Sequence, residues 1–188
     1  MIRASRSDHY IVWIDLEMTG LDVDKDHILE IACLVTDKNL NVISEDLNIV
    51  IHQSDIILEN MNDWCKENHT KTGLTQNSRS STVSLEEAEK MVLNFLKKYT
   101  LERSCPLAGS SVYMDRFFLH KYMPLVNEYL HYRIIDVSTV KEIARRWNPG
   151  VLNSMPKKKL NHRALDDIKE SINELRYYKK NFFKITTW

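Results

Sequence analysis

Apolar residues run almost without interruption through three segments near the N-terminus of the chain. The first, Ile11–Glu17, is apolar apart from two carboxylates and predicts a central strand. His27–Asp37 and Leu47–His52 predict a second and a third strand. Thr19–Asp22 ends the first strand in a turn, and Asn39 marks the next connection. Short connections of this kind indicate a meander of antiparallel strands.

The rest of the chain alternates short apolar runs with segments of helical periodicity. Ser84 and Glu87 have the spacing of a capping box, which opens a helix. The Ser/Thr-rich stretch Ser78–Ser84 predicts a loop, and Asn148–Gly150 predicts a break after a helix. The predicted helices are Asn60–Glu67, Ser84–Tyr99, Asp115–Tyr122, Ser138–Trp147 and Ala164–Lys179, and the strands among them are Leu107–Val112 and Arg133–Val137.

A meander followed by alternating strands and helices predicts one sheet with helices on its faces. We therefore expect an α/β fold in which a mixed five-stranded sheet is flanked by helices. The chain has 188 residues, the usual length of one domain, and no change of composition marks a boundary. We expect a single domain over residues 1–188, with its core between about residues 10 and 180.

Charge and composition then narrow the classes of function. Lys and Arg together number 26, as do Asp and Glu, so the formal net charge is zero. A protein that coats long polyanions would be basic, so any contact with nucleic acid should be local and short. No run of apolar residues is long enough to span a membrane, and Met1–His9 is polar with no apolar signal core. Three cysteines without CxxC spacing indicate free thiols and no zinc knuckle.

The two carboxylates of the first strand are the strongest chemical signal. Asp15 and Glu17 are two residues apart, so both side chains point to the same face of a strand. Two carboxylates in an apolar strand repel each other and lose hydration unless a partner compensates them. A hard divalent cation is one such partner. Solvation at the end of the strand is the alternative, and these residues alone leave both explanations open.

Three further residues carry weaker signals when each is taken by itself. Asp115 lies at the start of a predicted helix, where an acidic residue is ordinary. Asp166 and Asp167 both lie off the apolar stripe of the last helix, and periodicity barely separates them. His162, five residues before Asp167, has the simple alternative of a solvated or capping histidine.

Together, these residues form a recognisable pattern. Asp15-x-Glu17, then Asp115, then His162-x4-Asp167 resembles the DEDDh exonucleases of the RNase H-like fold. Several sequence motifs are similar to those of the oligoribonuclease family, and most of all to those of its eukaryotic branch, the RNA exonuclease 2 type. Those motifs are Trp13–Asp22, Asp63-Trp64 with His69, Thr72–Leu74, Asp115–Leu119, Lys121–Pro124, His131–Arg133, Ile135–Thr139 and His162–Ser171. The resemblance extends from about Ile11 to Tyr178.

The resemblance implies a metal-dependent enzyme that cuts very short RNA, dinucleotides especially, from the 3′ end into nucleoside 5′-monophosphates. Asp15, Glu17, Asp115 and Asp167 would hold two divalent cations per site, Mg²⁺ or Mn²⁺. His162 would be the general base, since an ordinary histidine pKa suits that role at neutral pH.

The resemblance also implies substrate contacts. Leu21 would wedge between two bases, Trp64 would stack on one, and His69 would approach the 3′ end. Tyr132 and Arg133 would act across a homodimer interface, and Ser111 and Ser138 would hold the 5′ phosphate together with Arg133. Without the resemblance, Trp64 is explained as a packing residue and Arg133 as half of a surface ion pair.

One position departs from the family. Gly109-Ser110-Ser111 stands where the family usually has Gly-Asn-Ser, so the loop loses a side chain able to brace it.

Two other functions remain as alternatives. The first is a DEDDh 3′-to-5′ exonuclease that acts on longer RNA or DNA, and the second is an RNase H-like module without catalysis. We expect short RNA oligonucleotides as partners, no membrane and no stable binding of long polymers. We expect the protein in the cytoplasm, in mitochondria or in both.

Overall fold

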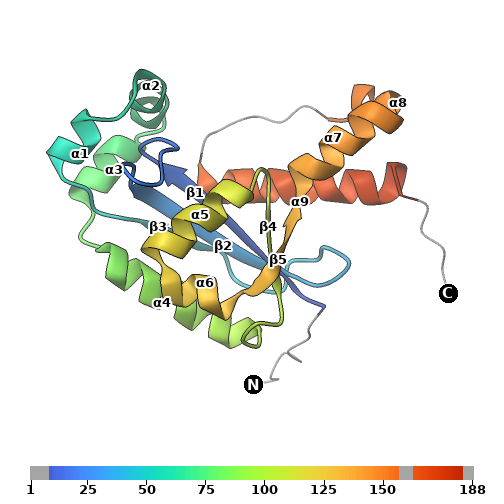
Figure 1. Cartoon of the computed structure of the whole chain (residues 1–188), viewed down its shortest axis with the longest axis horizontal. Coiled ribbons are helices and arrows are strands. Elements are labelled where there is room, and N and C mark those ends of the chain that lie inside the picture. Colours follow the sequence, from blue (N-terminus) through green and yellow to red (C-terminus); the bar gives the residue numbers. More distant parts are fainter. Residues whose placement is uncertain (1–8, 157–162, 184–188) are drawn as a thin grey trace.

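The computed structural model describes residues 9–156 and 163–183. Its centre is a five-stranded sheet with the order β3-β2-β1-β4-β5 (Figure 1). The strands are β1 (Ile11–Met18), β2 (Ile28–Thr36), β3 (Leu47–Val50), β4 (Pro106–Gly109) and β5 (His131–Asp136). The first three form an antiparallel meander, whereas β4 pairs in parallel with β1 and β5 in parallel with β4. The predicted mixed sheet is therefore confirmed.

Helices cover both faces of this sheet (Figure 1). They are α1 (Asp55–Glu59), α2 (Asp63–Lys71), α3 (Leu74–Ser80), α4 (Leu85–Tyr99), α5 (Tyr113–Tyr122), α6 (Pro124–Tyr129), α7 (Val137–Trp147), α8 (Pro149–Asn153) and α9 (Ala164–Asn181). The long helix α9 packs on one face against β1 and β2, while α4 and α5 pack on the other. Among the helices within the described ranges, none is both long and apolar enough to cross a membrane.

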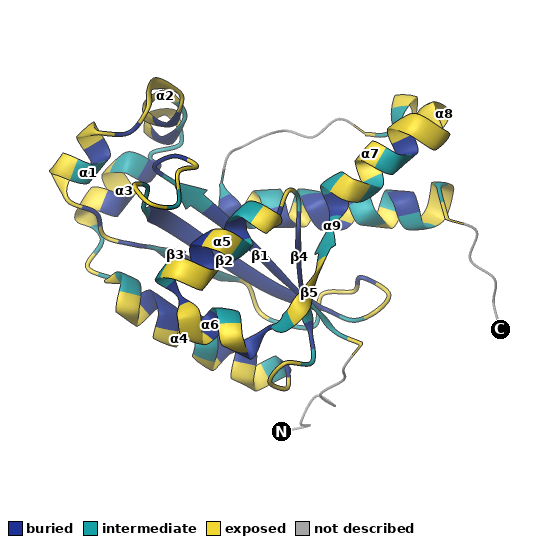
Figure 2. Ribbon diagram, in the orientation of Figure 1, coloured by how far each residue is buried: buried dark blue, intermediate teal, exposed yellow. Residues whose placement is uncertain are grey.

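The alternation along β1 sorts its side chains between two cores. Ile14 and Leu16 point to the core shared with α4 and α5, whereas Trp13 points to the core shared with α9. The Trp13 indole Nε1 donates to Thr36 Oγ1 at 3.0 Å, which satisfies its buried N–H. Figure 2 shows the result: buried residues fill most of β1, β2 and β4 and the inner faces of the helices, whereas β5 is partly exposed. Asp15 and Glu17 share the α9 face with Trp13 because strand side chains alternate.

Parallel pairing places the carboxyl ends of three strands next to one another. β1, β4 and β5 run in the same direction, so the segments that follow them start side by side. In α/β sheets ligands bind at these carboxyl ends. The segments are the loop after β1, the Ser110–Val112 loop after β4, and the start of α7 after β5.

Short helices account for the errors in the predicted elements. The predicted loop Ser78–Ser84 is wrong in its first part, because α3 continues to Ser80. The predicted helix start at Asn60 is also wrong, since Asn62 caps α2 by accepting from Cys65 N at 2.9 Å. Asn148 does end α7, but Pro149 at once opens α8. Helices of five to seven residues, such as α1, α3, α6 and α8, present too few turns for a periodic signal.

Candidate active site

Three carboxylates from distant parts of the chain meet beside β1. Asp15 and Glu17 come from the strand, and Asp167 comes from the first turn of α9. One carboxylate oxygen of each lies within 4.8 Å of those of the other two. We call these three residues the carboxylate cluster. The structure thus separates Asp167 from its neighbour Asp166, which periodicity alone did not, and brings together the residue that the family pattern had selected.

Asp115 is fixed next to this cluster by the backbone of β1. It lies in the first turn of α5 and is only 6% exposed. Its Oδ1 accepts from Leu16 N at 2.9 Å, at the residue between Asp15 and Glu17. The four acids named from the sequence are therefore gathered at one place by β1, α5 and α9.

Burial and mutual repulsion act strongly on these acids. Burial, with the charges of Asp115 and Glu17, raises the pKa of Asp15 well above its ordinary value. Burial, and then the charge of Asp167, raises the pKa of Glu17 to about 8. Burial raises the pKa of Asp115 to about 7, although backbone hydrogen bonds oppose the shift. A site built from these oxygen donors suits a hard divalent cation, which supplies the positive charge that the acids themselves lack.

A fifth acid, Glu30, was missed by the sequence analysis. It lies on β2 directly opposite Glu17 and is fully buried. Its carboxylate receives the guanidinium of Arg163, with Arg163 Nη2 at 2.6 Å from Glu30 Oε1. An acid inside the otherwise apolar run of β2 is the same signal that singled out Asp15 and Glu17.

Leu21, Trp64 and His69 line one cavity, of about 400 Å³, next to the carboxylate cluster. Glu17 and Met18 also line this cavity, so it borders the carboxylate cluster directly. Leu21 is 65% exposed and Trp64 57% exposed, so neither is a core residue. Of the alternative explanations of Trp64, this exposure excludes a core residue.

His69 is buried at the base of this cavity. Its Nε2 lies 2.9 Å from the carbonyl oxygen of Met18, and because a carbonyl only accepts, this nitrogen carries the proton. Its Nδ1 faces Glu17 Oε2 at 4.0 Å. The ring thus connects the cavity wall with the carboxylate cluster.

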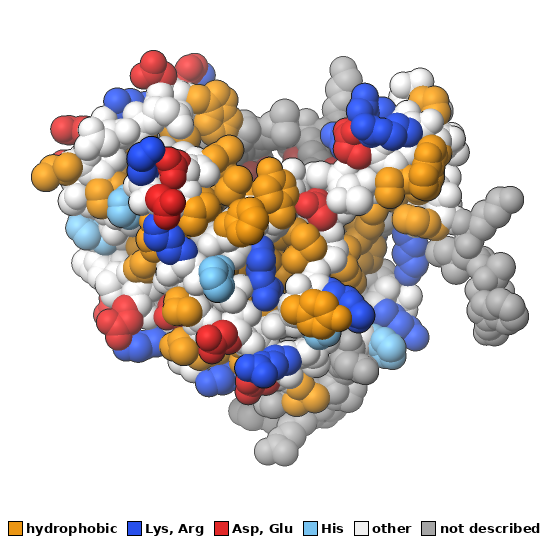
Figure 3. All heavy atoms as spheres, in the orientation of Figure 1, with side chains coloured by type: hydrophobic (Ala, Val, Ile, Leu, Met, Phe, Trp, Pro, Cys, Tyr) orange, Lys and Arg blue, Asp and Glu red, His pale blue; other side chains and the backbone are white. Residues whose placement is uncertain are grey.

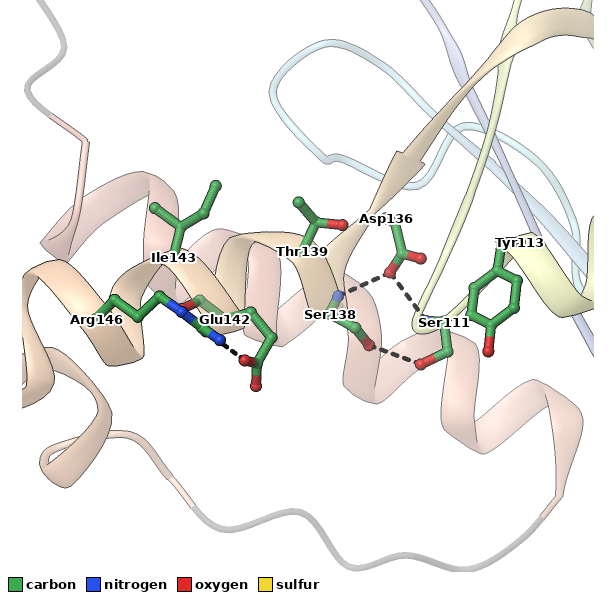
Figure 4. A pocket seen from close by; sticks show the side chains of 8 residues that line it. All are labelled: Ser111, Tyr113, Asp136, Ser138, Thr139, Glu142, Ile143 and Arg146. Atoms are coloured by element: carbon green, nitrogen blue, oxygen red, sulfur yellow. Dashed lines mark hydrogen bonds and ion pairs between the residues drawn. The ribbon is translucent and has the colours of Figure 1, made fainter.

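A second cavity of about 420 Å³ contains the two serines predicted for the 5′ phosphate (Figure 4). Asp136 Oδ1 accepts from Ser111 N and from Ser138 N, each at 2.9 Å. The Ser111 and Ser138 hydroxyls lie 3.1 Å apart. Ser111 has a φ of 55°, a left-handed conformation that its hydrogen bonds with Asp136 and Ser138 stabilise. Asp136, which organises the cavity, was not predicted; its position as the N-cap of α7 is the available signal.

Tyr132 and Arg133 lie apart from the two serines. Both are exposed on β5, the edge strand, and Tyr132 is 73% exposed. The guanidinium of Arg133 lies 5.1 Å from the centre of the Tyr132 ring. Arg133 does not line the serine cavity; the arginine that does is Arg146, paired with Glu142 (Figure 4).

Ser110, the residue that departs from the family, makes a hydrogen bond that braces its loop. Ser110 Oγ hydrogen-bonds with Ser171 Oγ of α9 at 2.9 Å, which ties the loop after β4 to that helix. The predicted base, His162, lies outside the described residues.

The surface agrees with a balanced net charge. Acidic and basic side chains are interspersed over the face seen in Figure 3, without one large field of a single sign. A long polyanion would favour a continuous basic track.

In sequence, this chain is similar to known exonucleases along most of its length. Residues 12–175 match the sequence model of the family RNase_T, described as exonuclease. The probable oligoribonuclease of Drosophila melanogaster is 56% identical over 177 residues, which are 94% of this chain and 84% of that protein. The mitochondrial oligoribonuclease of Homo sapiens is 55% identical over 174 residues, 93% of this chain and 73% of that one.

Among solved structures, the zinc-bound complex of E. coli exonuclease I with single-stranded DNA has a similar fold. Its TM-score is 0.72 at 15% identity, and the match covers 95% of this chain. This chain spans about two fifths (41%) of that exonuclease I chain. At this identity the likeness concerns the fold alone, and it confirms the expected RNase H-like sheet.

Proposed function

Because this chain belongs to the oligoribonuclease family of exonucleases, it is a 3′-to-5′ exoribonuclease, and we propose that the carboxylate cluster is the centre of its active site. The observation that carries the proposal is the meeting of Asp15, Glu17 and Asp167 within 4.8 Å, next to Asp115. The convergence of the four acids of the pattern argues against the alternative of a module without catalysis.

The donor set suits Mg²⁺ or Mn²⁺, held by the carboxylate cluster with Asp115 beside it. Two such cations would stabilise the negative charge that develops on phosphodiester oxygens during hydrolysis. The protein's own part is to fix the donors: Leu16 N holds Asp115, and α9 brings Asp167 to β1. We assign to His162 the role of general base, so His162→Ala should keep cation binding and lose most of the turnover.

We propose that the cavity lined by Leu21, Trp64 and His69 binds the 3′-terminal bases. Exposed apolar side chains beside a catalytic centre suit base stacking, which is worth roughly 1–3 kcal/mol per base and tolerates any sequence. The paired hydroxyls of Ser111 and Ser138 are proposed to receive the 5′ phosphate. A substrate held at both ends is a short one, which favours dinucleotides over polymers.

A homodimer is proposed, with Tyr132 of one protomer stacking in the site of its partner. The support is an aromatic ring left 73% exposed on an edge strand. The test is to mix Asp15→Asn protein with Tyr132→Ala protein. If Tyr132 acts across the interface, the mixture regains activity, because mixed dimers contain one site with both residues. If each variant stays as inactive in the mixture as alone, Tyr132 acts within its own chain.

The compartment follows only from relatives. The human relative is named as mitochondrial, and we propose that this protein acts in mitochondria, in the cytoplasm or in both.

Two neighbouring acids give a matched test of the proposed centre. Asp167→Asn should abolish Mn²⁺ binding by calorimetry and reduce cleavage of a dinucleotide at least a hundredfold. Asp166→Asn, which removes an equal charge from an exposed residue of the same turn, should leave both near wild type. Equal effects of the two substitutions would contradict the assignment.

A further inference from the structure

Glu30 is a buried carboxylate with four donors around it, and the proposed mechanism gives it no role. Arg163 reaches it through Nη2 at 2.6 Å and Nε at 3.2 Å from Oε1. Asn48 Nδ2 donates to the same oxygen at 2.9 Å, and Ala164 N donates to Oε2 at 3.2 Å. No surface of the carboxylate is exposed.

The position of Glu30 is unfavourable on charge alone. It lies opposite Glu17 in the register of β1 and β2, and so adds a negative charge beside the carboxylate cluster. A buried ion pair seldom stabilises a fold more than apolar residues of the same size would. The arrangement is therefore better explained by the geometry that it imposes than by stability.

That geometry concerns the start of α9. Arg163 is the N-cap residue of this helix, and Ala164 is its first residue. Arg163 makes no cap with its own side chain, so Glu30, from strand β2 beneath the helix, supplies the acceptor for the first amide. One turn later, Asp167 N donates to Arg163 O at 3.0 Å. Glu30 therefore holds both residues from which the first turn, and with it Asp167, is built.

We propose that Glu30 is a positioning residue, which fixes the first turn of α9 so that Asp167 meets Asp15 and Glu17 at the distance a cation needs. The inference rests on the proposed function of the carboxylate cluster. Glu30 touches neither substrate nor cation in this account, and acts through Arg163 and Ala164. Its removal should loosen the third ligand while the two ligands of β1 stay in place.

The chain offers a matched control in Glu89. This glutamate is also buried, 7% exposed, and also receives an amide of a helix's first turn, Leu125 N of α6 at 2.7 Å. It lies on α4, whose core is on the opposite face of the sheet from α9. Glu89→Gln and Glu30→Gln thus weaken the same kind of contact, one remote from the cluster and one beside it.

The test measures Mn²⁺ affinity by calorimetry, and kcat and KM on a dinucleotide, for protein shown to be folded by circular dichroism. Glu30→Gln should weaken Mn²⁺ binding and lower kcat by about tenfold to a hundredfold, as supporting residues of metal sites do. KM should change less than about threefold, because Leu21 and Trp64 lie on other elements. Glu89→Gln should lower the melting temperature and leave Mn²⁺ affinity near wild type.

A milder variant covers the case in which Glu30→Gln does not fold. Arg163→Lys keeps the positive charge but loses the guanidinium that binds Glu30 through two nitrogens. It should weaken Mn²⁺ binding by a smaller factor than Glu30→Gln does. The inference is overturned if Glu30→Gln or Arg163→Lys binds Mn²⁺ like wild type while only the melting temperature falls. If wild-type protein itself fails to bind Mn²⁺, it is the proposed centre that fails, and the Asp167→Asn comparison reports that separately.

Discussion

The acids beside β1 make the free energy of unfolding depend on pH in an unusual direction. Glu17 has a folded-state pKa of about 8 against an ordinary value of 4.5. Between these values the folded protein binds more protons than the unfolded chain, so the free energy of unfolding falls as pH rises. Asp115, with a pKa raised to about 7, acts in the same direction. Cation binding displaces those protons and should restore the lost stability.

We therefore expect the melting temperature in EDTA to fall by several degrees from pH 5.5 to pH 8. The increase in melting temperature on adding Mn²⁺ should be larger at pH 8 than at pH 5.5. The control is Glu17→Gln, which removes one of the titrating groups and should make the fall in melting temperature in EDTA smaller. A metal-free protein that becomes more stable towards pH 8 would contradict this assignment of charge.

Gly20 tests the loop that carries Leu21. A Cβ at Gly20 would lie 2.4 Å from Asp26 Oδ2. The Asp26 carboxylate is held in place because it accepts from Thr19 Oγ1 and Asp22 N, both at 2.8 Å. Gly20→Ala should therefore displace the loop and raise KM for a dinucleotide about tenfold, the loss of one stacking contact. Mn²⁺ affinity should stay near wild type.

The matched control for this substitution is Gly150→Ala. At Gly150 the nearest atom to an added Cβ is Asn148 Oδ1 at 3.6 Å, an ordinary contact. This variant should keep the wild-type KM. A wild-type KM for Gly20→Ala as well would show that the position of Leu21 does not set substrate affinity.

Single residues were predictable where burial made them anomalous. Asp15 and Glu17 stood out because carboxylates are rare in apolar strands. Glu30 is also a carboxylate in an apolar strand, but it was not identified from the sequence. Asp167 could not be separated from Asp166 by periodicity, since both lie in the first turn of α9. The family pattern selected Asp167, and the fold shows that its carboxylate meets Asp15 and Glu17.

A hydrogen bond between two serine side chains ties the loop before α5 to α9. Ser110, after β4, bonds with Ser171 of α9 at 2.9 Å, and α5 follows that loop directly. Ser110→Ala should lower the free energy of unfolding by about 1 kcal/mol, because it leaves a buried hydroxyl with one partner fewer. A double-mutant cycle with Ser171→Ala should give a coupling of roughly 0.5–1.5 kcal/mol in chemical unfolding.

Ser80→Ala is the control for this bond, because Ser80 is exposed and bonds only to carbonyls of its own helix. It should change the free energy of unfolding by less than about 0.5 kcal/mol. A coupling energy near zero between Ser110 and Ser171 would mean that the loop is held by its backbone alone.

Long elements were predicted well and short ones poorly, for a physical reason. The helix from Leu85 to Tyr99 has a capping box and several turns of periodic apolar residues, which together determine it locally. The short helices α1, α3, α6 and α8 depend on tertiary contacts, and the last three have Gly or Pro at their N-terminal ends. Their existence follows from packing, which the local pattern does not encode.

For the molecule as a whole, the site exists only because the fold joins distant segments. Glu17 and Asp167 lie at opposite ends of the sequence and become neighbours because α9 packs across β1 and β2. No spacing rule predicts that meeting; the family resemblance supplied it, and the structure gives its geometry. The split between two cavities, one with Leu21 and one with Ser111, was likewise visible only in the fold.

The central claim is that this centre cuts very short RNA with the help of divalent cations. The direct measurement is cleavage of 5′-labelled RNAs of two, seven and about twenty nucleotides, in Mn²⁺ or Mg²⁺ and in EDTA. We expect a strong preference for the dinucleotide, and EDTA should abolish all cleavage. Equal or faster cleavage of the longest RNA would contradict the proposed seat for a short substrate, and cleavage that persists in EDTA would contradict the carboxylate cluster as its centre.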